Sequence, residues 1–98
     1  MKTDIKKDGT SLTIIPDGRL DTKTAPEFKE VVEKNIEGAT NVTFDLKKLE
    51  YLSSAGLRVF MAAQKTMIKQ GKMRLINVGS DIMEIMDMVG LTGVFTIE

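Results

Sequence analysis

The order of the periodic segments constrains the fold of this chain more than any other feature of its sequence. Short runs of alternating apolar residues, typical of half-buried strands, take turns with longer segments in which apolar residues recur at helical spacing. Strands are expected at residues 10–15, 42–46 and 72–78, and helices at 25–37, from 53 or 54 to 70, and at 81–89. Because parallel strands need right-handed crossovers and the crossing helices must cover the sheet, this order predicts an α/β fold with a mixed sheet.

An antiparallel hairpin is expected before the first helix. Asp8-Gly9 accepts the positive φ angles of a tight type I′ turn, and the arm before it offers only Ile5 as an apolar residue, which is typical of a sheet edge. Residues 16–18, Pro-Asp-Gly, are expected to form a second turn. Residues 94–97 are compatible with a last short strand.

Local signals place the ends of the helices. Thr24-Ala25-Pro26-Glu27 has the spacing of a capping box with proline in the first turn, which predicts a helix start. Ser80 or Asp81 is expected to cap the third helix. The glycines at 38, 71 and 90 are expected to end the three helices.

Composition excludes several classes of function. The 98 residues, 42% of them hydrophobic, predict one soluble globular domain spanning residues 1–98. Fourteen basic residues balance fourteen acidic ones, so no overall field favours nucleic acid or an anionic membrane. The chain has no Cys and no His, and therefore lacks disulfides, thiol chemistry and the usual zinc ligands. We expect a cytoplasmic protein without a cofactor or a metal, without direct nucleic-acid binding and without membrane insertion.

The most informative segment is residues 51–58, Tyr-Leu-Ser-Ser-Ala-Gly-Leu-Arg, where a loop becomes a helix. Such a loop lies at the carboxyl ends of parallel strands, and the helix behind it presents unpaired N–H groups. A phosphate on Ser54 would add roughly −1.5 to −2 charges and find amide donors there. The alternative is that Ser53 or Ser54 is only the N-cap of the helix. Gly56 costs about 1 kcal/mol relative to alanine in a helix, which suggests close approach by another backbone or by a partner.

Other candidate residues have two interpretations each. Asp21 and Asp45 follow strand or loop ends expected at the same rim as Ser54; alternatively, Asp21 belongs to a turn or cap and Asp45 is a solvated strand end. Arg58, Met61 and Lys65, with Ala62, are candidates for a partner-docking helix face, although solvated helix surface is the ordinary role of the two cations. Methionines of the third helix are either core or an adaptable patch; they are Met83, Met86 and Met88. Met88 is out of step with the apolar stripe and is expected to be exposed.

The chain resembles the STAS domain, the fold of bacterial anti-sigma factor antagonists. The residues that carry the resemblance are Gly18-Arg19-Leu20-Asp21, Val42-Thr43-Phe44-Asp45-Leu46, and Tyr51 to Leu57. Known antagonists have Asp-Ser-Ser/Thr-Gly-Leu in the last of these segments, and the serine after the aspartate is phosphorylated. Aligned on Gly56-Leu57, that phosphoacceptor falls on Ser54, with Ser53 as the alternate. Ser53 stands where the family usually has aspartate, and Arg58 stands where small residues are common.

The resemblance implies a protein-binding switch and not an enzyme. The unphosphorylated domain would bind an anti-sigma factor that is also a serine kinase, and phosphorylation on Ser54 would release it until a serine phosphatase restores the serine. The partner-binding surface is expected to include Asp21, Asp45, Ser53, Gly56, Arg58, Met61 and Lys65. Two alternatives stay open: a non-switching STAS subunit of a larger signalling or transport assembly, and an enzyme or small-ligand site at the same rim.

Overall fold

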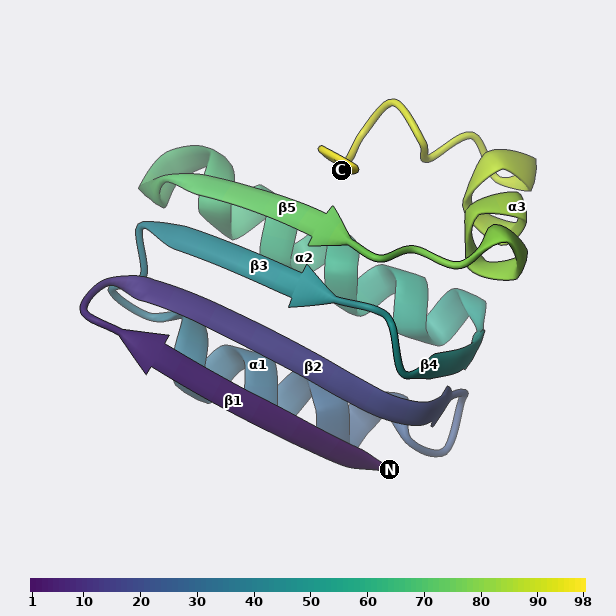
Figure 1. Cartoon of the computed structure of the whole chain (residues 1–98), viewed down its shortest axis with the longest axis horizontal. Coiled ribbons are helices and arrows are strands. Elements are labelled where there is room, and N and C mark those ends of the chain that lie inside the picture. Colours follow the sequence, from purple (N-terminus) through teal and green to yellow (C-terminus); the bar gives the residue numbers. More distant parts are fainter.

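The chain folds into a five-stranded mixed sheet with three helices, seen in the computed structural model of residues 1–98 (Figure 1). Its elements are β1 (Lys2–Asp8), β2 (Ser11–Leu20), α1 (Ala25–Ile36), β3 (Asn41–Asp45), β4 (Leu49–Leu52), α2 (Ser54–Gln70), β5 (Lys72–Ile76) and α3 (Ser80–Met88). The α/β class is confirmed, and so is the predicted alternation of strands and helices apart from the additional strand β4.

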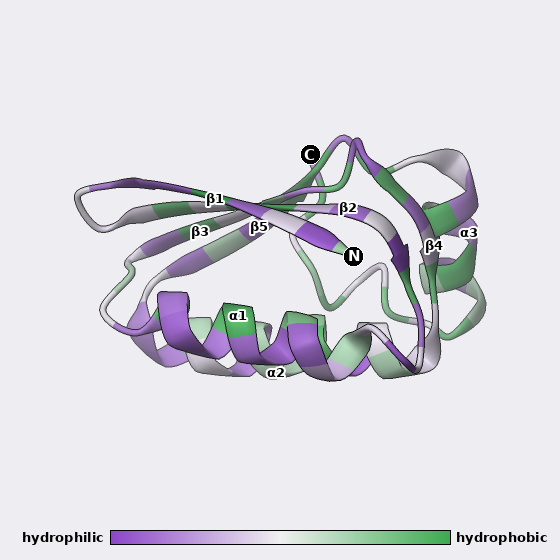
Figure 2. Ribbon diagram, turned by 90° about the horizontal axis from the view of Figure 1, so that it is seen from below, coloured by the Kyte–Doolittle hydropathy of each residue, from purple (hydrophilic) through white to green (hydrophobic).

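The sheet has the strand order β1-β2-β3-β5. The short strand β4 lies outside this order and pairs with β2. The pair β1–β2 is antiparallel, whereas β2–β3, β3–β5 and β2–β4 are parallel. Helices α1 and α2 lie side by side on one face of the sheet, and α3 lies at one end beside β4 (Figure 2). The opposite face of the sheet carries no helix along most of its length (Figure 2).

Three phenylalanines join the helix layer to the sheet. Phe28 of α1, Phe44 of β3 and Phe60 of α2 are all almost fully buried. Their ring centroids lie 4.9 to 6.3 Å apart, and the Phe44–Phe60 pair is edge to face. This is the preferred geometry of aromatic pairs, so the cluster stabilises the docking of both helices at once.

The predicted turn at residues 16–18 is wrong, because β2 runs through it without a break. Pro16 is tolerated in this strand since its missing N–H lies beyond the last β2–β3 pair, Ile14 with Phe44. Gly18 has a φ of 111°, and the register shifts between Gly18 and Arg19 where β2 leaves β1 and pairs with β4. The local turn signal therefore marks a bulge within a long strand.

The strand β4 was not expected from the sequence. Only its first and last residues, Leu49 and Leu52, are buried, and the two between them are exposed. This pattern does not alternate, so nothing in it indicates a strand. The chain forms one here because the end of β2 offers a free edge. The possible strand at 94–97 is reduced to one parallel bridge, between Leu75 and Ile97.

The glycines predicted to end the helices lie at their C-terminal ends, whereas the caps predicted for the starts of α1 and α3 are wrong. Gly38 and Gly90 have φ angles of 80° and 72°, and Gly71 passes so close to the Thr40 carbonyl that a Cβ would overlap it. The predicted capping box is wrong, because Thr24 has a helical backbone conformation and its side chain makes no capping hydrogen bond. At α3 the N-cap position is occupied by Gly79, so the predicted side-chain cap at residue 80 or 81 is also wrong.

Candidate functional site

The start of α2 is held against the end of β2. The Ser53 N–H donates a 2.8 Å hydrogen bond to the Leu20 carbonyl, which continues the parallel pairing of β4 with β2. Asp21, the next residue after Leu20, is thereby brought beside the first turn of α2. The sequence expectation that these segments meet at one rim is correct for Asp21.

The two adjacent serines have different roles. Ser53 has an extended backbone, and its Oγ accepts a 3.2 Å hydrogen bond from the Gly56 N–H, so Ser53 is the N-cap of α2. Ser54 is the first helical residue, is exposed, and makes no side-chain hydrogen bond within the protein. The capping interpretation is therefore confirmed for Ser53 and wrong for Ser54. The Ser54 hydroxyl is free to react or to bind.

The surroundings of Ser54 suit a negative charge. The first turn of α2 contains no acidic residue, and its unpaired N–H groups form the positive end of the helix dipole. Arg58 is exposed and lies four residues further along α2, on the same side of the helix as Ser54. A phosphate on Ser54 would meet the N–H groups of the helix start and Arg58 without displacing any buried group, and Asp21 at the same rim is the one opposing charge that the site residues supply.

Gly56 has an internal packing role. It is buried, and a Cβ at this position would lie 2.6 Å from Leu20 Cγ and 2.8 Å from Leu52 Cδ1. The close approach expected from the sequence is present, and the neighbours within this domain are leucine side chains rather than another backbone. Glycine here lets the first turn of α2 pack directly against Leu20 of β2 and Leu52 of β4.

Asp21 organises the loop before α1. Its Oδ1 accepts hydrogen bonds from the N–H groups of Lys23 and Thr24, both at 3.0 Å. The pKa of Asp21 is lowered from its ordinary value, chiefly by the bond from the Thr24 N–H, with a further contribution from Lys23. The turn interpretation of Asp21 is thus correct, and the ionised carboxylate remains half-exposed at the rim.

Asp45 is only 6% exposed, so its interpretation as a solvated strand end is wrong. Oδ1 accepts from Asn77 Nδ2 at 3.0 Å and from the Lys47 N–H at 3.2 Å, and Oδ2 lies 3.4 Å from Lys47 Nζ. Burial by itself would raise the pKa of Asp45, but these donors outweigh it and lower the pKa. None of its polar contacts reaches Asp21, Ser53 or Ser54. Asp45 instead ties the ends of β3 and β5 together.

Asn77, the hydrogen-bond partner of Asp45, is a residue that sequence reasoning missed. It has a φ of 54°, a left-handed conformation that asparagine tolerates better than most residues. This conformation places its amide on Asp45. The position of an asparagine just after a strand is the one signal that the sequence offers for it.

Arg19 and Tyr51 form a cation–π pair, which the sequence does not predict. The guanidinium carbon of Arg19 lies 4.4 Å from the centroid of the Tyr51 ring, and the two residues are paired across β2 and β4. Tyr51 is 37% exposed, so this cation–π pair forms part of the surface beside Ser53. Its formation depends on β4, which is why it could not be anticipated.

The expected docking face of α2 is exposed. Arg58, Met61 and Lys65 are spaced three and four residues apart and so lie on one side of the helix. Arg58 also lines a groove of about 260 Å³ between the starts of α1 and α2, together with Lys29 and Pro26. The groove contains no acidic side chain.

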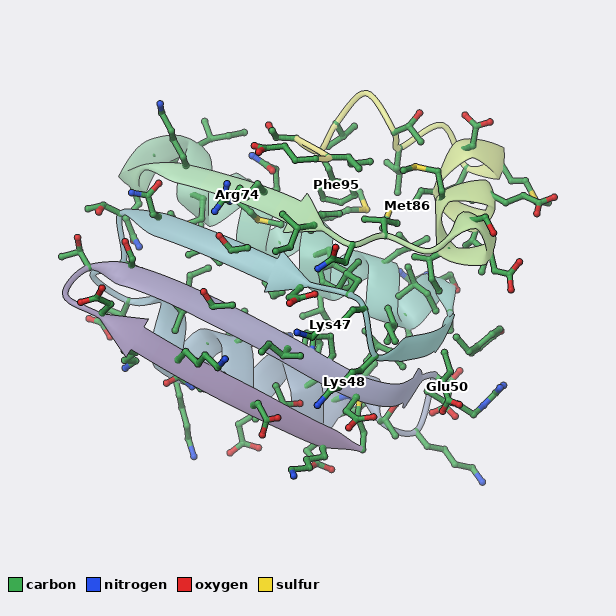
Figure 3. All side chains as sticks on the ribbon, in the orientation of Figure 1. Lys47, Lys48, Glu50, Arg74, Met86 and Phe95 are labelled. Carbon is green, nitrogen blue, oxygen red and sulfur yellow. The ribbon has the colours of Figure 1, made fainter.

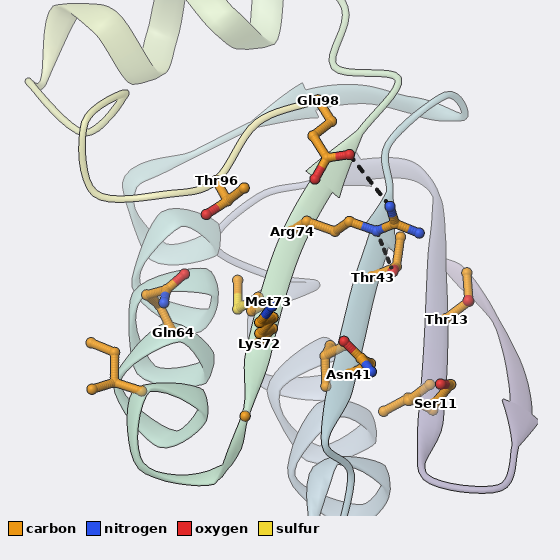
Figure 4. Close-up of a pocket in the computed structure, with 14 residues that line it drawn as sticks. Ser11, Thr13, Asn41, Thr43, Gln64, Lys72, Met73, Arg74, Thr96 and Glu98 are labelled. Carbon is orange, nitrogen blue, oxygen red and sulfur yellow. Dashed lines mark hydrogen bonds and ion pairs between the residues drawn. The ribbon is translucent and has the colours of Figure 1, made fainter.

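The largest groove, of about 890 Å³, lies over the β5 side of the sheet and not at the Ser54 rim (Figure 4). Arg74 crosses it, with Nε donating to Thr43 Oγ1 at 3.0 Å and Nη1 lying 3.4 Å from a Glu98 carboxylate oxygen (Figure 4). Lys47 and Lys48, in the loop between β3 and β4, lie over the same side of the sheet beside β2 (Figure 3). None of the helices combines the length and the apolar character needed to cross a bilayer.

Comparisons with known proteins agree with this geometry. The model of the STAS domain family matches residues 2–98. The anti-sigma-B factor antagonist of Bacillus subtilis is 26% identical over 98 residues, which cover 99% of this chain and 90% of the relative. The structure of an anti-sigma factor antagonist from Mycobacterium paratuberculosis superposes with a TM-score of 0.89 at 20% identity, covering 98% of this chain and 83% of that one. The Bacillus cell fate determinant SpoIIAA in its phosphorylated form superposes with a TM-score of 0.75 at 15% identity, covering 99% and 91% of the two chains. The sequence match over almost the whole chain, together with the mixed sheet and the serine at the start of α2, establishes that the protein belongs to the STAS domain family and is distantly homologous to anti-sigma factor antagonists.

Proposed function

We propose that this domain is an anti-sigma factor antagonist whose binding to its anti-sigma factor is switched off by phosphorylation of Ser54. The observation that carries the proposal is the division of roles between the two serines. Ser53 caps α2, whereas the Ser54 hydroxyl is exposed and unbonded. The distant homology to antagonists supports the function, and the phosphorylated form of one structural neighbour supports the modification.

The domain is the substrate of the switch and not its catalyst. The partner kinase transfers a phosphoryl group from ATP: a bond forms between Ser54 Oγ and the γ-phosphorus, the bond to ADP breaks, and the hydroxyl proton passes to a base of the kinase. A serine phosphatase hydrolyses the ester with water and restores the hydroxyl. This domain contributes only the accessible hydroxyl and a helix start that accepts the charge.

The bound partner covers the rim around Ser54 and the exposed face of α2. Arg58 and Lys65 supply positive charge to this surface, and Met61, which is 42% exposed, supplies an apolar contact. Asp21 lies at the edge of the surface. A phosphate on Ser54 adds roughly −1.5 to −2 charges in the middle of this surface. The added charge weakens binding by repulsion and by its desolvation cost, while the fold stays intact. The protein acts in the bacterial cytoplasm, where its partners regulate transcription.

The test is a pull-down from native lysate with unmodified bait, Ser54→Ala and Ser54→Asp, followed by mass spectrometry of the captured proteins and of the bait. A matched Ser53→Ala bait controls for the neighbouring hydroxyl. We expect one kinase to be retained by the unmodified, Ser54→Ala and Ser53→Ala baits and lost with Ser54→Asp, and phosphate to map to Ser54.

Two results would contradict the proposal. Capture of the same kinase-free complex by all four baits, without phosphate on Ser54, would identify a constant STAS subunit of a larger assembly. Phosphate on Ser53 alone would move the switch to the cap residue. Circular dichroism of Ser54→Asp checks that lost binding is not lost folding, because the start of a helix tolerates an anion.

A further inference from the structure

The outer edge of β1 is a free sheet edge with an unusual charge pattern. β1 pairs with β2 alone, so its other side faces solvent along residues 2–8 (Figure 1). Lys2, Asp4, Lys6 and Asp8 alternate in sign along one side of the strand, and none of them makes an ion pair within the protein. An exposed strand edge normally invites pairing with another strand.

The backbone groups that are free on this edge follow from the sheet register. The Thr10 carbonyl, just before β2, accepts hydrogen bonds from the N–H groups of Thr40 and Asn41 at the start of β3. Because the backbone groups of a strand point alternately to its two sides, the even-numbered residues of β2 direct their N–H and C=O groups toward β3. The odd-numbered residues of β2 therefore face β1, where they pair with the even-numbered residues 4, 6 and 8. The N–H and C=O groups of Thr3, Ile5 and Lys7 consequently point outward.

We infer that this edge binds the same edge of a second copy of the chain, in an antiparallel pair centred on Ile5. In that register Ile5 faces Ile5 of the second copy, and Thr3 faces Lys7. These are the residues whose backbone groups are free, so each of them both donates and accepts across the pair. The contact is isologous and closes on itself as a two-fold dimer.

The charges match in this register. Lys2 lies opposite Asp8 of the second copy, and Asp4 lies opposite Lys6, so the two-fold axis creates four opposite-charge pairs. These positions do not exchange hydrogen bonds across the pair, and at such positions the side chains approach most closely. All four pairs lie on the sheet face without helices, because Lys6 and Asp8 pair with Thr13 and Ser11 on that face.

Neighbouring registers are disfavoured by the same charges. Sliding one strand by two residues in either direction keeps the backbone groups matched. One shift, however, places Lys2 opposite Lys6 and Asp4 opposite itself, whereas the other places Asp4 opposite Asp8 and Lys6 opposite itself. Like charges directly opposite each other destabilise a strand pair. The sequence of β1 is thus complementary to itself in one register.

Apolar contact adds to the pairing on the other face. Ile5 is half-buried and packs against the core, on the side of the sheet that α1 covers. Pairing Ile5 with its symmetry mate removes its remaining exposed surface from water. The start of α2 lies across β2 from this edge (Figure 1), so the dimer contact is separate from the proposed phosphorylation site.

The test is a charge exchange measured by sedimentation velocity from about 1 µM to about 1 mM protein. Asp4→Lys sets the introduced lysine of each copy opposite Lys6 of the other, and is expected to raise the dimer dissociation constant about tenfold or more. The double variant Asp4→Lys with Lys6→Asp restores opposite charges and is expected to restore dimerisation. Glu84→Lys makes the same charge change on α3, far from β1, and is expected to have no effect.

Hydrogen exchange gives a second, residue-specific measurement. The amides of Thr3, Ile5 and Lys7 are expected to become protected as protein concentration rises, whereas those of Asp4 and Lys6 are protected at every concentration. A wild-type protein that stays monomeric throughout the range overturns the inference. Dimerisation that responds equally to Asp4→Lys and Glu84→Lys, or that the double variant does not restore, overturns it as well.

Discussion

Two neighbouring serines show how backbone conformation separates identical side chains into different roles. Ser53 is held extended by its hydrogen bond to Leu20, so its hydroxyl turns back onto the Gly56 N–H. Ser54 begins the helix, and its side chain projects outward. The hydroxyl needed for stability and the hydroxyl available for modification are therefore one residue apart.

This division predicts unequal effects of removing the two hydroxyls. Ser53→Ala should lower the free energy of unfolding by about 1 kcal/mol, because it removes an N-cap. Ser54→Ala should change it by less than about 0.5 kcal/mol, because it removes no hydrogen bond. Urea denaturation of the two variants beside wild type measures both values. A greater loss for Ser54→Ala would mean that Ser54, and not Ser53, caps α2.

Asp45 predicts a loss of stability in acid. Its pKa in the folded protein lies below the ordinary value of 3.8, so the unfolded chain takes up the proton first as the pH falls. The contribution of the carboxylate is complete well above that value and disappears as the pH falls through 3.8 toward the folded-state pKa. The Asp45→Asn variant keeps an acceptor for Asn77 and Lys47 but does not titrate. Its stability should therefore fall less steeply in acid than that of wild type, as measured by urea denaturation between about pH 6 and pH 3. Parallel curves would contradict the assignment.

At the scale of elements, α3 shows how a short helix combines core and surface. Ile82 and Met86, four residues apart, are buried, whereas Met88 is 81% exposed. Met86 and Phe95 lie between α3 and β5 (Figure 3), so they close this end of the core. The interpretation of the methionines as core is thus correct for Met86, and the predicted exposure of Met88 is confirmed.

The two methionines should respond very differently to truncation. Met86→Ala is expected to lower the free energy of unfolding by about 2–5 kcal/mol, because it leaves a cavity among buried side chains. Met88→Ala should change it by less than about 0.5 kcal/mol, because its side chain is surrounded by solvent. Thermal or urea unfolding measures both, and a large cost for Met88→Ala would show that its side chain is covered in solution.

At the scale of the whole molecule, the three helices pack on two different parts of the sheet. α1, α2 and the central strands share the phenylalanine cluster, whereas α3 packs against β4 at the end of the sheet (Figure 2). Only two residues of α3 are buried, but the central strand β3 buries four of its five. The two parts therefore differ in what holds them in place.

This difference predicts that α3 opens without global unfolding. Native-state hydrogen exchange in low concentrations of urea should give a lower opening free energy for the amides of α3 than for those of β3. The physical reason is that opening α3 exposes few apolar side chains, whereas opening β3 exposes the centre of the core. Equal opening free energies in the two elements would show a single cooperative unit.

Much of the fold could be predicted because its signals are local. The apolar spacing of α1 and α2 and the terminal glycines act within a few residues, and the segment around Ser54 was proposed as the site on the same basis. The predicted hairpin is present, but the predicted type I′ turn at Asp8-Gly9 is wrong. Asp8 already pairs with Ser11, so the loop residues are Gly9 and Thr10, and only Gly9 has a positive φ. The features that were missed depend on contacts distant in the sequence. β4 forms only against the end of β2, and Asn77 meets Asp45 only when β3 and β5 are adjacent.

The sequence by itself determined the α/β class, the order of the strands and helices apart from β4, and the position of the proposed site at the start of α2, because each rests on periodicity or on a short motif. Only the tertiary structure decided which of the two serines is free. Either hydroxyl satisfies the preference for an N-cap, and the choice is made by the hydrogen bond from Ser53 to Leu20. That bond forms because β4 lies beside β2, a contact that no local pattern indicates.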